Sequence, residues 1–336
     1  MKIYNIPIES LKERYSAQWN RWFPAEFNRL GVEYETIEGD RIDDGISVGS
    51  FLDVYDTNYY KLSQLRTIVR KIKEGEITDS DILFFHDIWF PGLESLQYIR
   101  QGAGKRFKIY GILHAGTYDP YDYLSKCGMG SWGKKVEEAW FSFVDGIFVA
   151  TRFHRDLLVA QRDIDSEKIH ITGLPIYGNE IAAPALDSVY KEDIVVFPHR
   201  LDSEKNPQMF DELADRLKNT GWKFIKTKEV CKTKTEYYRL LSKAKIAVSF
   251  ADQETWGIAQ QESLFCGCIP VVPNRLSYRE MYYSCFLYTT FETSVLLIER
   301  IMKDTRRFQK IASENALLLS LMGESAIEKM TKEMMR

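Results

Sequence analysis

The sequence predicts an α/β protein made of two doubly wound domains, each with a parallel sheet, followed by a helical segment at the end of the chain. Strand-like and helix-like segments alternate almost from end to end. The strand-like segments are nearly all apolar, which is expected where helices cover both faces of a parallel sheet. With 336 residues, 45% of them hydrophobic, the chain is large enough for two buried cores.

The first half contains five strand-like segments: KIYNIPI, VEYETIE, DILFFH, FKIYGILH and GIFVAT. Ser16 is placed to cap a helix that continues to about Leu30. Helical patterns such as KLSQLRTIVRKIKEG (61–75) and KKVEEAWFSFV (134–144) lie between the strands, with apolar residues recurring at three and four positions. We therefore expect residues 1–177 to form the first domain.

A break in the pattern separates the two halves. Residues 178–192 have no clear period and carry Gly, Pro and acidic residues, so we expect them to be a linker. A new series with DIVVFP, KFIK, KIAVSF, IPVV and FLYTT predicts a second domain over residues 193–314. Residues 315–336 are expected to be a C-terminal helix, a candidate for packing back on the first domain. Two such domains are expected to face a cleft at the carboxyl ends of their strands, where α/β sheets bind ligands.

The composition and net charge of the chain limit the cellular environments and binding partners that we expect for it. The net charge of −3 provides no global attraction to nucleic acid. The apolar runs are far too short to span a bilayer, and the start, MKIYNIPIES, lacks the apolar region of a signal peptide. Five scattered cysteines suit reduced thiols rather than a disulfide framework. We expect a cytoplasmic protein with no membrane span.

The most informative stretch is SFADQETWGIAQQESLFCGCIPVVP (249–273). It places Glu254 and Glu262 eight residues apart around a Trp-Gly turn that opens into a helix. The free N–H groups at a helix start attract phosphate, and carboxylates accept hydrogen bonds from sugar hydroxyls. The stretch therefore suits a phosphorylated, polyhydroxylated ligand. The alternative is an ordinary loop-helix-strand unit with two solvated glutamates.

A second cluster opens the second domain, in FPHRLDSEKNPQMF (197–210). Arg200 and Lys205 lie just after a buried strand, in the loop before a helix that Pro207 can start. A guanidinium beside an ammonium suits a diphosphate. The alternative is a basic loop whose charges pair with Asp202 and Glu204. Because this loop and the one with Glu254 belong to the same sheet, we expect both to emerge at one edge.

These motifs together resemble the retaining GT-B glycosyltransferases of the glycogen-synthase and mannosyltransferase superfamily. The usual pattern is Gly-Arg-Leu-x-x-Glu-Lys, then Glu-x-Phe-Gly-x-x-x-x-Glu-Ala, then Gly-x-Pro-Val. His199 stands here for the first Gly and Ser263 for the Ala, and His199 together with CGCIPVVPNRLSYRE is closer to the tRNA-queuosine mannosyltransferase branch. The good match covers about a hundred residues of the second domain, and the first domain matches in layout only. The matching residues are Arg200, Leu201, Glu204, Lys205, Glu254, Trp256, Gly257, Glu262, Gly267, Pro270 and Val271.

The resemblance implies a GT-B fold with two Rossmann-like domains, and it implies roles for individual residues. Arg200 and Lys205 would neutralise the diphosphate of a nucleotide sugar as it leaves. Glu254 would bind donor-sugar hydroxyls and Glu262 the ribose. The remaining donor-binding residues would be Trp256, Gly257 and Ile258, the last two through backbone N–H groups. No Asp-x-Asp stands in a convincing place for a metal, so the cations would substitute for one, and no cofactor is expected beyond the nucleotide-sugar co-substrate.

The first domain is expected to supply the acceptor side. His114 follows the strand-like FKIYGIL, where a histidine is most often structural, but the resemblance implies that it contacts the donor sugar and takes part in catalysis. His86 and Asp87 end another strand, with the alternative of a capped strand under an aromatic lid. The Gly-rich loop common after the first strand is missing, and YSAQWNRWF occupies its place. The acceptor-side candidates are Tyr15, Ser16, Gln18, Trp19, His86, Asp87 and Trp89.

The function expected is that of a retaining, metal-independent glycosyltransferase, a hexosyl- or pentosyltransferase. It would move a sugar from a nucleotide-diphosphate sugar to an acceptor hydroxyl. The resemblance to the queuosine branch and the aromatic-rich first domain, whose exposed Trp and Tyr can stack splayed bases, make a modified nucleobase in DNA or tRNA the leading acceptor, and the acidic balance argues against it. A glycan or small-molecule acceptor stays open. So do a nucleotide-sugar epimerase or phosphorylase and a non-catalytic nucleotide-sugar-binding module.

Overall fold

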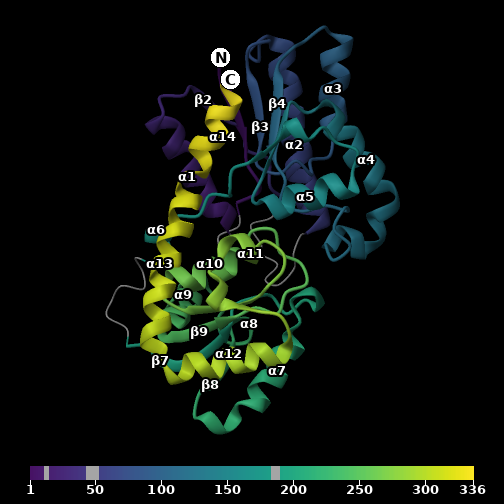
Figure 1. The fold of residues 1–336 in the computed structure, drawn as a ribbon. Helices are drawn as coiled ribbons and strands as arrows, with labels where there is room; N and C mark the ends of the chain where they lie inside the picture. The colour runs from purple at the N-terminus through teal and green to yellow at the C-terminus, as the bar shows by residue number, and fades with distance from the viewer. Residues whose placement is uncertain (11–14, 43–52, 183–189) are drawn as a thin grey trace. The chain divides into compact units, whose positions relative to one another are not determined.

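The computed structural model describes residues 1–10, 15–42, 53–182 and 190–336. The chain divides into two compact units. Unit 1 consists of residues 1–150, 155–172 and 327–336, and unit 2 consists of residues 151–154 and 173–326. Figure 1 colours the chain from purple at the N-terminus to yellow at the C-terminus, so the strands of unit 1 are purple to teal and those of unit 2 are green. Each unit is an α/β domain with its own sheet.

Unit 1 is built on a six-stranded sheet in the order β2-β1-β3-β4-β5-β6, in which all pairs are parallel. The strands carry the buried aliphatic and aromatic residues that the sequence predicted, such as the ILFF of β3. They are β1 (Ile3–Ile6), β2 (Tyr34–Thr36), β3 (Ile82–Phe85), β4 (Lys108–Ile112), β5 (Gly146–Val149) and β6 (Ile169–Ile171).

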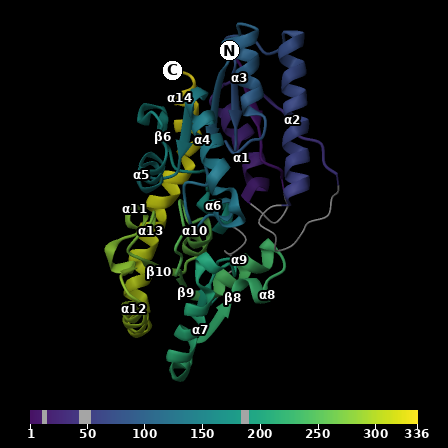
Figure 2. The same ribbon diagram turned by 90° about the vertical axis from the view of Figure 1, so that its right-hand side faces the viewer.

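Helices connect these strands (Figure 2). The longest, α2, begins after Asp53, whose carboxylate accepts the N–H groups of Tyr55 and Asp56, and ends at Gly75 in the left-handed conformation. The helices of this region are α1 (Tyr15–Arg29), α2 (Val54–Glu74), α3 (Leu93–Gly102), α4 (Gly130–Phe143) and α5 (Arg152–Gln161), with a π-helical turn η1 (Ser125–Met129) and a 3-10 turn η2 (Ser166–Lys168).

The order of the first sheet reverses between β1 and β3, because β1 continues to β2 on one side while the later strands follow on the other. Such a reversal is a topological switch point, and ligands of open α/β sheets bind at the carboxyl ends of the strands there. The loops that follow β1 and β3 begin at Pro7 and His86. The predicted residue His86 therefore stands at the switch point of unit 1.

Unit 2 contains a five-stranded parallel sheet in the order β11-β10-β9-β7-β8. Its switch point lies between β7 and β9, which pair directly, with Val195 opposite Ile246. The strands are β7 (Glu192–Phe197), β8 (Lys223–Lys226), β9 (Ala244–Val248), β10 (Ile269–Pro273) and β11 (Leu287–Tyr288). The fold-class prediction of two parallel-sheet α/β domains is confirmed.

The helices of unit 2 follow its strands in the expected alternation. Thr233 begins α9 with a capping box, in which its side chain and that of Glu236 exchange bonds with each other's backbone N–H. The helices are α6 (Gly178–Ala182), α7 (Pro207–Arg216), α8 (Thr227–Val230), α9 (Lys234–Lys243), α10 (Ile258–Phe265), α11 (Tyr278–Met281), α12 (Phe291–Lys303) and α13 (Thr305–Glu324). The described residues of unit 2 also form the 3-10 turns η4 (Ser203–Lys205), η5 (Lys218–Thr220) and η6 (Ser284–Phe286).

Three local expectations differ from the structure. Ser16 lies inside α1 rather than at its cap. Within the predicted linker, Gly178–Ala182 form α6 and Glu192 already belongs to β7, while residues 183–189 lie outside the described part. The predicted helix 315–336 is two helices, since α13 already begins at Thr305 and α14 spans Ala326–Met334.

The last helix belongs mostly to unit 1. Figure 1 shows α14 beside α1, and an ion pair of 2.8 Å joins Glu328 on α14 to Arg29 at the end of α1. A second contact of 3.7 Å joins Glu333 to His170 on β6. Residues 327–336, which form most of α14, therefore belong to the unit that contains β1.

Candidate functional site

The candidate site of unit 2 is formed by two loops at neighbouring strand ends. One loop follows β7 and carries His199, Arg200 and Lys205, and the other follows β9 and carries Glu254. Because β7 and β9 pair in parallel, both loops emerge at the same edge of the sheet. The backbone N–H of Asp252 donates to the carbonyl of Glu204 at 2.8 Å and ties the loops together. The sequence prediction that these motifs share an edge is confirmed.

Lys205 and Glu254 form the centre of this cluster. The Lys205 Nζ lies 3.5 Å from Glu254 Oε2, and it also donates to the backbone carbonyl of Gln253. Both side chains are largely buried, with 7% and 16% of their surface exposed. Burial alone would raise the pKa of Glu254, but Lys205, His199 and backbone N–H groups outweigh it and hold that pKa below its usual value. Glu254 is therefore an ionised carboxylate at neutral pH.

The turn after Glu254 is shaped by a glycine. Gly257 has a φ of 68°, in the left-handed region that favours glycine, and its N–H donates to Glu254 Oε1 at 2.8 Å. A Cβ at this position would stand 3.2 Å from the ring of Tyr278. The turn brings Ile258 to the first position of α10, where backbone N–H groups have no partner within the helix. These N–H groups suit an anion next to the Glu254 carboxylate.

Arg200 pairs with the acidic residues of its own loop. Its guanidinium lies 2.9 Å from Asp202 and 3.3 Å from Glu204, and 36% of its side chain is exposed. This is the arrangement that the sequence left open as the alternative to phosphate binding. Ion pairs at this exposure contribute little to stability, so an incoming diphosphate can compete for the guanidinium at small cost.

Glu262 is held by α9, a contact that the sequence reasoning missed. Its carboxylate accepts from Lys234 Nζ at 2.5 Å and from the hydroxyl of Tyr238 at 2.8 Å, and its side chain is 4% exposed. Lys234 ends the lysine-rich run KFIKTKEVCKTK (223–234), and such a run usually indicates solvated surface. A signal was present, because Thr233 and Glu236 form a recognisable helix start that turns Lys234 and Tyr238 to one side of α9.

Two buried polar side chains of the loops keep an atom without a hydrogen-bond partner among the described residues: His199 through Nε2 and Trp256 through Nε1. Their exposed fractions are 3% and 1%. Burial, helped by the charge of Lys205, lowers the pKa of His199 to about 3. His199 is therefore neutral at physiological pH. A buried polar atom without a partner is rare in native structures and calls for an explanation.

The switch point of unit 1 brings together the predicted acceptor-side residues His86 and Tyr15 and the predicted catalytic residue His114. His86 Nε2 bonds Asn5 Oδ1 on β1 at 2.6 Å, and His114 Nε2 donates to the carbonyl of His86 at 2.7 Å. The hydroxyl of Tyr15 lies 3.5 Å from His114 Nδ1. Burial lowers the pKa of His86 to about 3, and burial also lowers the pKa of His114. Both imidazoles are neutral hydrogen-bonding groups at physiological pH.

Trp19 requires a correction. The sequence suggested an exposed ring on which an acceptor base stacks, but Trp19 is 0% exposed. Its ring centroid lies 5.2 Å from that of His114 and 5.6 Å from that of Phe23, so it packs beneath the histidine. A ring buried on all sides has no face for a base. Of its neighbours on α1, Ser16 is also buried and Gln18 is partly exposed.

Asp87 and Trp89 belong to a different network. Asp87 forms an ion pair with Lys61 on α2 at 2.7 Å, and the indole N–H of Trp89 donates to Glu137 Oε1 at 2.8 Å. Glu137 is fully buried and pairs with Arg162 at 2.8 Å. The same carboxylate accepts the N–H and the hydroxyl of Thr117, three residues after His114. This network fixes the loop that follows β4.

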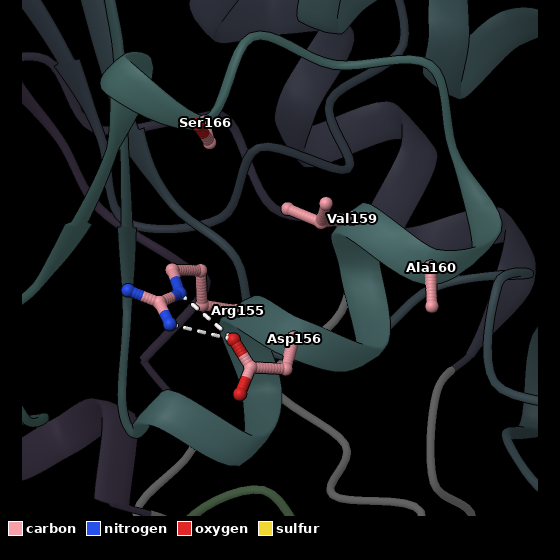
Figure 3. Close-up of a pocket in the computed structure, with 5 residues that line it drawn as sticks. All are labelled: Arg155, Asp156, Val159, Ala160 and Ser166. Carbon is pink, nitrogen blue, oxygen red and sulfur yellow. Dashed lines mark hydrogen bonds and ion pairs between the residues drawn. The ribbon is translucent and has the colours of Figure 1, made fainter.

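A surface pocket of about 500 Å³ lies elsewhere in unit 1 (Figure 3). Arg155, Asp156, Val159, Ala160 and Ser166 line it, and Arg155 pairs with Asp156 at 2.7 Å. None of the predicted site residues lines this pocket. In the part of the chain that the structure describes, no helix is long and apolar enough to cross a membrane.

Known proteins resemble the chain in fold and, over a shorter stretch, in sequence. No family profile matches it. The tRNA-queuosine alpha-mannosyltransferase of Drosophila melanogaster is 32% identical over 104 residues, which is 31% of this chain and 26% of that protein. The chain thus matches about a quarter of the length of this curated relative.

Among solved structures, the sucrose-phosphate synthase of Thermosynechococcus elongatus aligns with a TM-score of 0.67 over 100% of this chain and 98% of its own, at 15% identity. A mutant of S. aureus TarM, in complex with fondaparinux, alpha-GlcNAc-glycerol and UDP, has a TM-score of 0.61 over 82% and 59% of the two chains, at 16% identity. The lipopolysaccharide outer core galactosyltransferase WaaB has a TM-score of 0.58 over 95% and 99%, at 15% identity. The chain has the GT-B fold of these glycosyltransferases.

Proposed function

We propose that the protein is a retaining glycosyltransferase that needs no metal and transfers a sugar from a nucleotide-diphosphate sugar to an acceptor hydroxyl. The observation that carries the proposal is the pair of Lys205 and Glu254 at the switch point of unit 2, with the N-terminus of α10 beside it. This combination offers a cation and backbone N–H groups to a diphosphate and an ionised carboxylate to a sugar. The GT-B fold is consistent with this chemistry.

The charges of the site match those that develop in the reaction. The bond between the anomeric carbon and the phosphate oxygen breaks, and its electron pair leaves with the nucleoside diphosphate. Positive charge develops on the sugar near Glu254, and negative charge develops on the phosphate near Lys205 and Arg200. The acceptor oxygen forms the new bond to the anomeric carbon from the same face, and its proton passes to the departing phosphate. No protein nucleophile and no cofactor is required.

Each remaining residue of unit 2 has a part in this proposal. Glu262, held by Lys234 and Tyr238, accepts hydrogen bonds from the ribose hydroxyls. Gly257 and Ile258 supply backbone N–H groups to the phosphate or the sugar, the Gly257 N–H in exchange for its bond to Glu254, and the buried Trp256 precedes them in the same turn. In unit 1, His114 contacts the donor sugar, with its ring held by the carbonyl of His86.

For the acceptor, we propose a modified nucleobase in tRNA or DNA, handled in the cytoplasm. The support is the sequence similarity to a tRNA-queuosine alpha-mannosyltransferase. Exposed aromatic residues of unit 1, such as Trp132 and Tyr121, fit a nucleobase better than the buried Trp19 does. The net charge of −3 favours a glycan or small molecule instead, which is the second candidate.

The test is release of nucleoside diphosphate from a panel of UDP-, GDP- and ADP-sugars, with and without tRNA. The wild-type protein is expected to turn over one donor, also with excess EDTA. Lys205→Ala should reduce turnover by roughly tenfold to a hundredfold, because it removes a charge-assisted contact of about 1.5–3 kcal/mol. The control is Lys218→Ala, an exposed lysine of unit 2 that pairs only with Asp215 among the described residues.

Three outcomes would redirect the proposal. Normal turnover in Lys205→Ala rules out the diphosphate role. Complete loss in EDTA, restored by Mn²⁺ or Mg²⁺, points to a metal-dependent class of glycosyltransferase. A donor that is isomerised without any acceptor indicates an epimerase instead.

A further inference from the structure

We propose that His199 binds the diphosphate of the donor as a neutral N–H donor, through its buried Nε2, which has no hydrogen-bond partner in the part of the chain that the structure describes. This inference rests on the proposed function and adds a residue that stands where the related motif has glycine. His199 is 3% exposed, and among the described residues its Nε2 makes no hydrogen bond. A glycine here would leave the position to the backbone alone, whereas this chain places an imidazole in the loop.

The surroundings of His199 favour an anionic ligand. The charges of Lys205 and Arg200 act on the imidazole and disfavour its protonated form, and the charge of Glu254 acts in the opposite sense. The cationic side chains of Lys205 and Arg200, together with a neutral imidazole N–H, favour the binding of an anion. The ring of Phe197, the last residue of β7, lies 5.2 Å from that of His199 and supports it from the side of the sheet.

The energetics favour a ligand as the missing partner. A buried polar group without a hydrogen bond destabilises the folded protein, because the group has lost its bonds to water. A phosphate oxygen that accepts from Nε2–H relieves this cost at the moment of binding. Because the imidazole is already neutral, it donates one hydrogen bond without taking up a proton. His199 thus complements Lys205, which supplies charge, with a directed contact.

The experiment measures binding of UDP, GDP and ADP alone by isothermal titration calorimetry, using the full chain. Among these, the nucleotide that the wild type binds most tightly is the probe. His199→Leu keeps much of the volume and removes the N–H, so its dissociation constant should rise by roughly tenfold to a hundredfold. His199→Gln keeps a neutral N–H donor and should lose less. His170→Gln, on β6 of unit 1, is the control and should bind as the wild type does.

A double-mutant cycle then tests whether His199 and Lys205 act on the same group. If both contact one diphosphate, the combined effect of His199→Leu and Lys205→Ala differs from the product of the single effects. Proton uptake provides a further readout. The number of protons bound with the nucleotide, obtained in buffers of different ionisation enthalpy, should be equal in the wild type and in His199→Gln. A larger uptake in the wild type would mean that the imidazole binds as a cation.

The outcomes separate this inference from the proposed function. If Lys205→Ala weakens nucleotide binding but His199→Leu does not, the inference is wrong and the proposed function stands. If His199→Leu weakens binding of the nucleotide sugar but not of the nucleoside diphosphate, Nε2 accepts from a sugar hydroxyl and the phosphate assignment is overturned. If the wild type binds none of the three nucleotides, both proposals are wrong.

Discussion

The two switch points of this molecule are formed by different kinds of side chain. In unit 1, His86 after β3 and His114 after β4 contact the ring of Trp19 on α1, and Asn5 on β1 is bonded to His86. In unit 2, the strand ends of β7 and β9 carry charges of both signs, with Lys205 beside Glu254. The first cluster is held mainly by packing. The second is held by ion pairs and hydrogen bonds that a ligand can exchange for its own.

Buried side chains at the two switch points are therefore expected to respond differently to substitution. A substitution in the aromatic cluster is expected to act on stability first, because the side chains pack in the core. A substitution in the charged cluster is expected to act on ligand binding first, because a bound ligand can replace its ion pairs with contacts of its own. Substitutions in each unit test this contrast between effects on stability and effects on ligand binding.

The largest effect is expected for Glu137→Ala in unit 1. This change leaves Arg162, whose side chain is 5% exposed, as a buried charge without its partner carboxylate. Removal of one member of a buried ion pair costs about 3–5 kcal/mol. Urea unfolding should show this loss. Glu138→Ala, the adjacent residue with a partly exposed pair to Lys134, should cost less than about 1 kcal/mol. Equal effects would show that the network does not hold unit 1.

Trp19→Ala should have an effect of similar or slightly smaller size. The indole is fully buried between α1 and the histidines, and removal of a buried Trp typically costs about 3–5 kcal/mol. Trp132→Ala, in which the ring is 49% exposed, should change stability much less. Thermal unfolding of both variants measures the difference. A stable Trp19→Ala protein with impaired acceptor binding would restore the stacking role that the buried position argues against.

The buried histidines of both switch points should make the protein sensitive to acid. The pKa of His86 and that of His199 are each about 3 in the folded protein, against 6.5 for an ordinary histidine. The unfolded chain therefore binds more protons below pH 6.5, and each histidine removes up to about 1.4 kcal/mol of stability per pH unit until the folded value is reached.

His199→Gln and His86→Gln should each flatten this dependence between pH 6 and pH 4, as measured by urea unfolding at several pH values. The groups that act on His199 are Lys205, Glu254 and Arg200, and His114 acts on His86. If the variants lose stability with pH as steeply as the wild type does, these imidazoles are not neutral in the folded protein.

The smallest effect on stability is expected for Arg200→Ala. Its ion pairs to Asp202 and Glu204 are partly exposed, so their loss should cost less than about 1 kcal/mol. Donor turnover should nevertheless fall by roughly tenfold or more, since one charge-assisted contact to the diphosphate is lost. Parallel unfolding and turnover measurements test this separation of stability from activity. A variant with normal turnover would confine Arg200 to the loop's own ion pairs.

Much of the fold could be predicted because it depends on local patterns. Apolar runs such as the ILFF of β3 specify buried parallel strands, and the apolar period of residues 61–75 predicted most of α2, although not its start after Asp53. The shared edge of the loops with Lys205 and Glu254 followed from two strands of one sheet. The division of the C-terminal helical stretch into α13 and α14 was not predicted.

The contacts that depend on distant parts of the chain could not be predicted. Nothing in the sequence around Trp19 indicates that it packs against His114, because the two residues are far apart along the chain. The pairing of Glu262 with Lys234 likewise links α10 to α9 across the sequence. Short motifs identify chemistry at strand ends, whereas the partners of each side chain are decided by tertiary packing.

Thermal-shift measurement against a panel of nucleotide sugars tests most directly whether the charged switch point of unit 2 binds a nucleotide sugar. A ligand at 100 times its dissociation constant adds about 2.7 kcal/mol, which should raise the melting temperature by roughly 5–10 °C in a domain of this size. We expect such a rise in melting temperature for at least one nucleotide sugar with the wild type, and a clearly smaller rise with Lys205→Ala and Glu262→Gln. No shift with any nucleotide sugar, or an equal shift in all three proteins, would contradict it.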